Sequence, residues 1–219
     1  MHAIYNFVSG PLVWVSFIIF VGGSIYKLIS MAALAKKKDP MVFVYMDMKY
    51  ALRSIFHWVI PFMSVNSRKK PIFTIVTFLF HIGITLVPIF LFAHVVLIKE
   101  SWDISWWFIS DSTADLFTLI VIGACIFFLV RRLTQQEVKF LTSPSDFVLL
   151  AIVAAPFVTG FWAYHQWVGY NVMGILHILA GEVMLAAIPF TRLSHMIFFP
   201  FTRGYMGSEF GAIRKAIDW

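Results

Sequence analysis

The sequence has little charge for its length. Of its 219 residues only 13% are Asp, Glu, Lys or Arg, whereas 60% are hydrophobic, and the mean hydropathy is +0.85. Soluble domains are nearer one quarter charged and one half apolar. A soluble domain of this length could not bury so much apolar surface, so the composition predicts an integral membrane protein.

Cysteine is also almost absent, with Cys125 as the only one. A single cysteine excludes an internal disulfide, a C-x-x-C redox pair, a covalently attached c-type haem and a cysteine-ligated iron–sulfur cluster. A metal centre in this chain must therefore use His, Met or carboxylate ligands. Cys125 itself lies in an apolar run, where we expect it to pack.

Five apolar segments reach the length of about 20 residues that a membrane-spanning helix needs. They cover residues 11–34, 71–98, 113–131, 146–165 and 171–198. The fourth contains Pro156 and Gly160, which membrane helices tolerate where neighbours satisfy the freed backbone groups. The sequence thus predicts an all-α integral membrane protein with five transmembrane helices, forming one membrane domain over residues 1–219.

The basic residues set the predicted orientation. All of the 17 Lys and Arg residues except Lys99 fall on one side of these five helices, and positive charge gathers on the cytoplasmic side. We therefore expect the N-terminus outside, the C-terminus in the cytoplasm, and a multi-pass protein of the bacterial inner membrane. No Lys or Arg precedes the first segment, while Lys36, Lys37 and Lys38 follow it, which favours a permanent helix over a cleaved signal peptide.

Two cytoplasmic segments lie outside the spans. Residues 40–63 mix apolar and charged side chains, which predicts a helix on the cytoplasmic interface or one docked on a partner. Residues 199–219 form a short basic tail. On the other side of the membrane, tryptophans flank the loops as an aromatic belt: Trp102, Trp106, Trp107, Trp162 and Trp167.

The histidines are the residues that most clearly indicate a chemical function. Three of the seven histidines, His2, His57 and His165, are near helix ends or outside the spans, and we expect structural roles for them. The other four lie within predicted helices, where ionisable side chains are costly and usually functional. They are His81 and His94 in the second helix, and His177 and His195 in the fifth.

These four histidines pair by depth in the membrane. The second helix runs outward and the fifth runs inward, so His94 is level with His177, and His81 with His195. Each pair offers one imidazole from each of two helices, as two axial ligands of a haem iron require. Zinc or copper would need three or four ligands close together. The pattern therefore favours two b-type haems.

The spacings test this hypothesis unequally. His177 and His195 are 18 residues apart, which is about five turns and about 27 Å of one helix, so both would share a face. His81 and His94 are 13 residues apart, about 3.6 turns, and would point apart in a straight helix. Pro88 lies between them and predicts a kink that realigns them; otherwise only one pair ligates.

Other residues suit a haem site. Arg192 and Arg203 flank the inner end of the fifth helix, as propionate partners or as positive-inside anchors. Glu182 is the acidic residue deep in a helix, predicted to handle protons, to hydrogen-bond a ligand or to form a structural pair. Lys99, the lone outer cation, is a candidate contact for a quinone oxygen or a propionate.

The stretch from His177 to His195, ending in Pro189-Phe190-Thr191-Arg192-Leu193-Ser194-His195, resembles the last helix of the nitrate reductase gamma-subunit family of cytochromes b. That family has five transmembrane helices with the N-terminus outside. The resemblance implies two haems held by histidine pairs on helices two and five, here His81, His94, His177 and His195.

The helix-two spacing of 13 residues is wider than in nitrate reductase gamma subunits. The chain is more similar to membrane cytochrome b subunits of sulfate-reducer redox complexes, such as the high-molecular-weight cytochrome c complex or the sulfite-reductase-linked complex. The resemblance implies menaquinone, a cytoplasmic iron–sulfur subunit, other membrane subunits and a periplasmic multihaem cytochrome c as partners, and no nucleic acid.

Three functions remain open from the sequence. The first is a dihaem cytochrome b, the electron-transfer subunit of a quinone-linked oxidoreductase complex. The second is a haem conduit that joins two protein partners and has no quinone site. The third is a non-redox membrane scaffold or transporter, which would bind no chromophore.

Overall fold

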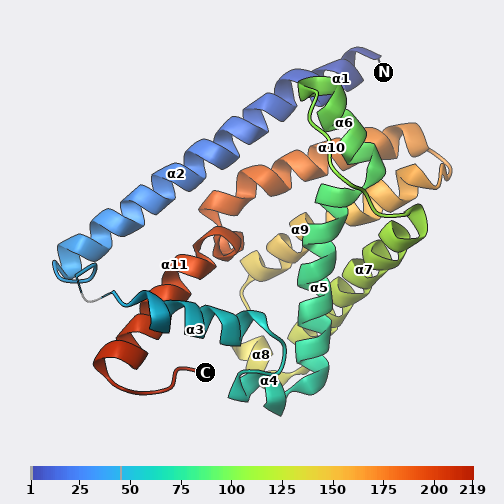
Figure 1. Ribbon diagram of the computed structural model, residues 1–219. Coiled ribbons are helices and arrows are strands. Elements are labelled where there is room, and N and C mark those ends of the chain that lie inside the picture. The colour runs from blue at the N-terminus through green and yellow to red at the C-terminus, as the bar shows by residue number, and fades with distance from the viewer. Residues whose placement is uncertain (1, 45) are drawn as a thin grey trace. The chain divides into compact units, whose positions relative to one another are not determined.

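A computed structural model describes residues 2–44 and 46–219 (Figure 1). Within these residues, five helical segments are long and apolar enough to cross a membrane: His2–Lys38, Pro71–Phe90, Asp111–Thr134, Pro144–Tyr164 and Tyr170–Phe190. The predicted helical, multi-pass architecture is therefore confirmed. The chain divides into two compact units, where the sequence predicted a single domain.

The first unit combines the chain up to Thr74 with Glu182–Trp219. Its long apolar helix consists of α1 (His2–Phe7), a π-turn η1 (Val8–Leu12) and α2 (Val13–Lys38). Gly23 of α2 lies against the rings of Pro189 and Phe190, where an added Cβ would come within 2.9 Å of Pro189 and 2.8 Å of Phe190. This glycine therefore permits the close approach of α2 to the chain after the fifth span.

Two short helices follow in the loop between the first and second spans. In α3 (Met48–Val59) the Asp47 side chain caps the N-terminus by accepting from the amides of Lys49 and Tyr50. In α4 (Val65–Lys69) Ser64 has the same role. Within the predicted interfacial segment 40–63, the helix is α3, which begins after the Asp47 cap and ends at Val59.

The fifth span differs from its prediction. The helix α10 (Tyr170–Ala187) ends well before residue 198 and continues as two short 3-10 turns, η2 (Ile188–Phe190) and η3 (Arg192–Ser194). Thr191 between them is fully extended, with φ −121° and ψ −174°. A new helix, α11 (His195–Ser208), then begins. The expectation that His177 and His195 share one face of one helix is therefore wrong.

The short basic tail predicted for residues 199–219 is largely helical. The helix α11 and a final π-turn η4 (Glu209–Ile213) pack along α3, as Figure 1 shows. Small residues make this contact close, because Gly204 faces Ala51 and Gly207 faces Ser54. The last residues return to α3, where the ring of Trp219 stacks on His57 with 3.9 Å between ring centroids.

The second unit, Ile75–Gly181, contains most of α5 (Pro71–Phe90) and the start of α10. Between them lie α6 (Phe92–Trp102), α7 (Asp111–Thr134), α8 (Gln136–Leu141) and α9 (Pro144–Tyr164). Its core is formed by Val87, Val121, Cys125 and Phe157. Cys125 packs there, as the sequence predicts.

The ends of the spans in this unit are set by local side chains. Ser110 caps α7 by accepting from the amide of Thr113. At α9, Ser143 and Asp146 form a reciprocal capping box, with Pro144 in the first turn. Asp146 is also 3.7 Å from Arg132, which holds the end of α7 beside the start of α9.

The close packing of α3 on α11 generates a stability prediction. In Gly207→Ala the new methyl would clash with Ser54 Cβ and lie 2.8 Å from the Tyr50 carbonyl oxygen. We expect the free energy of unfolding to fall by about 1–3 kcal/mol, measured by thermal unfolding in detergent. The matched control is Gly22→Ala, whose methyl meets nothing within 4 Å. Equal stability of the two variants would contradict this packing.

Candidate functional site

The second span is interrupted close to His94. Leu91 adopts an extended conformation with φ −67° and ψ 130°, so α5 ends at Phe90 and α6 starts at Phe92. The sequence predicts a kink from Pro88; the structure has a full break one turn later. A break in an apolar helix leaves carbonyl groups without intrahelical donors, and lipid cannot supply them.

Three groups satisfy the carbonyls at this break. His94 Nδ1 donates to the Pro88 carbonyl oxygen at 2.8 Å. The indole Nε1 of Trp106 donates to Ile89 at 2.8 Å, and the amide of Ile109 donates to Phe90 at 2.9 Å. The break therefore orients His94, while the loop after α6 closes over the remaining acceptors. Trp106, expected only as part of an aromatic belt, has this specific role.

His177 on α10 is held by the neighbouring helix α9. Its Nδ1 donates to the carbonyl oxygen of Pro156 at 2.8 Å. Gly160, one turn further along α9, lies beside the same ring: an added Cβ would be 2.7 Å from His177 Nδ1 and 2.8 Å from Cε1. Sequence reasoning noted Pro156 and Gly160 only as tolerated irregularities and missed this contact. The small residue inside an apolar span was the available signal.

The structure brings His94 and His177 together. Their ring centroids are 6.0 Å apart and their planes differ by 11°. Two imidazole–metal bonds of about 2 Å each, with the distance from each nitrogen to its ring centre added, give about 6 Å between centroids. The separation of the rings therefore fits two axial ligands on one metal.

The hydrogen bonds also fit that role. A backbone carbonyl only accepts, so Nδ1 of each ring carries the proton and Nε2 keeps its lone pair. Metal-bound histidines usually donate their second ring N–H to a carbonyl or carboxylate in this way. Both rings are partly buried, and the donor set suits haem iron.

His81 belongs to the second unit and His195 to the first. His81 Nδ1 donates to the Thr77 carbonyl one turn earlier, at 2.7 Å. His195 Nδ1 donates to the Arg192 carbonyl at 2.7 Å, across the turn that begins α11. Both rings thus have the same tautomer as the first pair, and both are exposed within the chain.

Two of the three other histidines, His57 and His165, differ from this pattern in their surroundings. His57 donates from Nδ1 to Arg53, but its ring face is covered by Trp219. His165 uses Nε2, which lies 3.3 Å from Asp115 Oδ1. Among the described residues no three His, Cys, Asp or Glu side chains gather as a metal-binding group, so these side chains do not supply the ligand number of a zinc site.

The two predicted arginines have different surroundings. Arg203 is committed within the first unit: its guanidinium forms an ion pair with Asp218, donates to Ser54 Oγ at 2.7 Å and lies over the Trp58 ring. These contacts argue against the predicted bond from Arg203 to a haem propionate. Arg192 lies exposed in η3, three residues before His195.

Two further predicted residues lie on the helices that carry His94 and His177. Lys99 is exposed in the last turn of α6. Glu182 is on α10, five residues after His177, and is only 7% exposed. Neither oxygen of Glu182 has a hydrogen-bond partner among the described residues. A buried carboxyl without a partner is costly. That cost is the physical reason to propose a role for Glu182 in handling protons.

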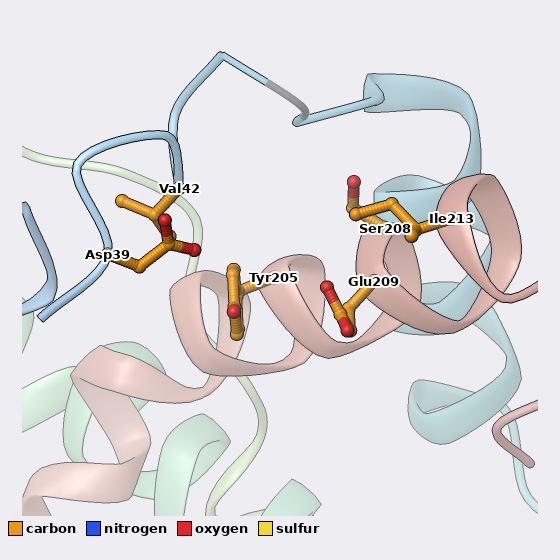
Figure 2. A pocket seen from close by; sticks show the side chains of 6 residues that line it. All are labelled: Asp39, Val42, Tyr205, Ser208, Glu209 and Ile213. Carbon is orange, nitrogen blue, oxygen red and sulfur yellow. The ribbon is translucent and has the colours of Figure 1, made fainter.

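A small pocket also occurs in the first unit (Figure 2). Its cavity volume is about 20 Å³, far below the roughly 300–1,000 Å³ of most ligand sites. It contains none of the predicted site residues. Its lining comes from the chain after α2 and from α11 and η4: Asp39, Val42, Tyr205, Ser208, Glu209 and Ile213.

Comparison with known proteins gives one full-length relative. The chain is 35% identical over 215 residues to a protein of Nitratidesulfovibrio vulgaris strain Hildenborough, and the match covers 96% of this chain and 95% of that protein. No family model matches the chain. No solved structure matches it either.

The contact between Gly160 and His177 generates a second prediction. In Gly160→Ala the methyl would displace the His177 ring from the Pro156 carbonyl. We expect the haem bound per chain to fall, measured as the pyridine haemochrome of purified protein. Gly123→Ala is the matched control, because its methyl on α7 meets nothing within 4 Å. Wild-type haem content in both variants would contradict the assigned role of Gly160.

Proposed function

We propose that this chain, which belongs to one family with the Nitratidesulfovibrio vulgaris protein, is a dihaem b-type cytochrome of a membrane redox complex. It would carry electrons across the bacterial inner membrane and exchange them with menaquinol. The observation that carries the proposal is the near-parallel pair of His94 and His177, each with Nδ1 bound to a backbone carbonyl and Nε2 left as a ligand.

Haem iron, when bound, cycles between ferric and ferrous states and so carries one electron at a time. The chain's own residues set how firmly it is held and at what potential. The Pro88 and Pro156 carbonyls orient the outer imidazoles and increase the basicity of Nε2. Thr77 and Arg192 do the same for His81 and His195, the ligands proposed for the inner haem.

The charge distribution supports the proposed orientation of the chain in the membrane. With the basic loops in the cytoplasm, His94 and His177 lie toward the outer side, and His81 and His195 toward the inner side. Two haems at different depths would form an electron path across the apolar layer. Arg192, close to His195, is the residue we assign to an inner propionate, because guanidinium binds carboxylates through paired hydrogen bonds.

The proposed partners follow from the resemblance stated above. A cytoplasmic iron–sulfur subunit would exchange electrons at the inner haem, other membrane subunits would contact the spans, and a periplasmic multihaem cytochrome c would face the outer side. Menaquinone would react near the outer haem, where Lys99 is a candidate contact.

The haem content of the purified protein tests the proposal. We expect a dithionite-reduced minus oxidised spectrum with b-type bands, and two haems per chain in the pyridine haemochrome. Each of the two predicted histidine pairs would supply two imidazole ligands to one iron. A folded protein, shown by circular dichroism, that binds no haem would contradict the proposal and would favour a membrane scaffold.

The link to quinol is a separate prediction. We expect menadiol, a soluble menaquinol analogue, to reduce the haems of the detergent-purified wild type, followed by their absorbance. Vesicles or micelles without the protein give the background rate for the same reagent. A protein that binds two haems and is reduced by dithionite but not by menadiol would be a conduit between protein partners, without a quinone site.

A further inference from the structure

His165, expected from the sequence to be structural, lies in a cluster of aromatic and acidic side chains. It follows the last residue of α9, and its Nε2 is 3.3 Å from Oδ1 of Asp115 on α7. Both side chains are close to one-third exposed. A histidine paired with a carboxylate at an accessible position is suited to accept and release protons.

Aromatic rings surround the imidazole of His165. The ring of Phe161 is 4.3 Å away between centroids, Tyr164 is 5.4 Å away and Trp167 is 5.9 Å away. Flat aromatic walls with a few polar groups are typical of sites for planar organic ligands. Within the second unit, this cluster therefore places aromatic surface beside a histidine–carboxylate pair, the two features that recognition and deprotonation of a quinol head group require.

The cluster is close to the proposed outer haem ligand along one helix. Gly160 touches the His177 ring, and Phe161, the next residue, contacts His165. Five residues separate Gly160 from His165, a rise of about 7.5 Å. An electron donor bound beside His165 would thus lie one to two turns from His177, on the side of the unit where α9 ends and α10 begins.

We infer that His165 and Asp115 are the proton-accepting pair for quinol oxidation at this end of the second unit. The inference rests on the proposed function. Asp115 would accept from Nε2–H, which leaves the lone pair of Nδ1 for a quinol hydroxyl proton. Asp115 is a positioning residue that stabilises the imidazolium, and His165 then releases the proton to water at its exposed edge.

Oxidation of one quinol to quinone breaks two O–H bonds and releases two protons and two electrons. The two haems proposed for this chain would, when bound, supply the two one-electron acceptors that this oxidation needs. The protons pass singly through His165 to water. The titratable groups that face His165 are Asp115 from α7 and Tyr164 from α9, and Tyr164 is in turn hydrogen-bonded to Asp111 of α7.

The experiment compares the wild type with His165→Gln and Asp115→Asn in the full-length, haem-loaded protein. The measured rate is that of haem reduction by menadiol. We expect His165→Gln to lower this rate on the order of 100-fold, as loss of a general base does, and Asp115→Asn to lower it less.

Two further measurements separate a proton acceptor from a structural residue. Added imidazole should restore the rate of His165→Gly, because the site is partly exposed. Menadione binding, followed by quenching of tryptophan fluorescence, should weaken in His165→Ala because the ring lines the site. Haem content and reduction by dithionite should stay at the wild-type level in all variants. The control His2→Gln, at an exposed terminus, should leave every readout unchanged.

The outcomes distinguish failure of the inference from failure of the proposed function. A wild type without haem overturns the proposed function, and the inference with it. A wild type that binds haem but is not reduced by menadiol overturns the quinol link and this inference, and leaves the haem assignment intact. A wild type reduced by menadiol, with His165→Gln and Asp115→Asn equally fast and His165→Gly insensitive to imidazole, overturns the inference alone.

Discussion

Hydrogen bonds from histidine ring nitrogens to backbone carbonyl oxygens are the interactions on which the proposed site depends. In an apolar layer each carbonyl needs a donor from the protein. The break at Leu91 releases the Pro88 carbonyl, and His94 satisfies it. The Pro156 carbonyl accepts from His177 in the same way. The requirement to pair backbone groups thus fixes the tautomer of both imidazoles, so that each Nε2 keeps its lone pair, as the proposed metal ligation would need.

The arrangement of His94 and His177 differs from that of a buried structural histidine in how the two ring nitrogens are used. A structural histidine in lipid would be expected to use both ring nitrogens, whereas the two rings here use Nδ1 on backbone and lie near-parallel at a distance suited to a shared metal. Gly160 has no side chain where the His177 ring approaches. The contacts that support the outer pair all come from the second unit, so this half of the proposed site is built without help from the first.

The spans themselves could be predicted from the sequence, because runs of apolar residues and the positions of basic residues can be read directly along the chain. The break between α5 and α6 could be predicted only in part: Pro88 signalled an irregularity, but the extended residue is Leu91, which carries no breaking signal. At the fifth span Pro189 was a signal for the end of the helix, but the 18-residue spacing of His177 and His195 favoured one continuous helix. Pro189 follows Ala187 by two residues, as prolines often follow helix ends, and this ended the helix before His195.

Other features depend on contacts between distant segments, which residue types alone do not reveal. The partner of His177 is a carbonyl group 21 residues away. Arg203 was predicted as a propionate partner from its place near the inner end of the fifth helix, yet α11 packs on α3 and Asp218 returns to pair with it. The pairing of His165 with Asp115 spans 50 residues. In each case the residue type could be read from the sequence, but its partner was decided by the tertiary fold.

The most direct test of the central claim is the haem stoichiometry of His94→Ala, His177→Ala and the double variant. If the two imidazoles bind one iron, each single substitution removes the same haem and the double variant loses no more than either single. Haem per chain should then fall from two to one in all three. Loss of two haems in the double variant with one lost in each single would mean that the histidines serve different sites. Unchanged haem content in all three would contradict the account.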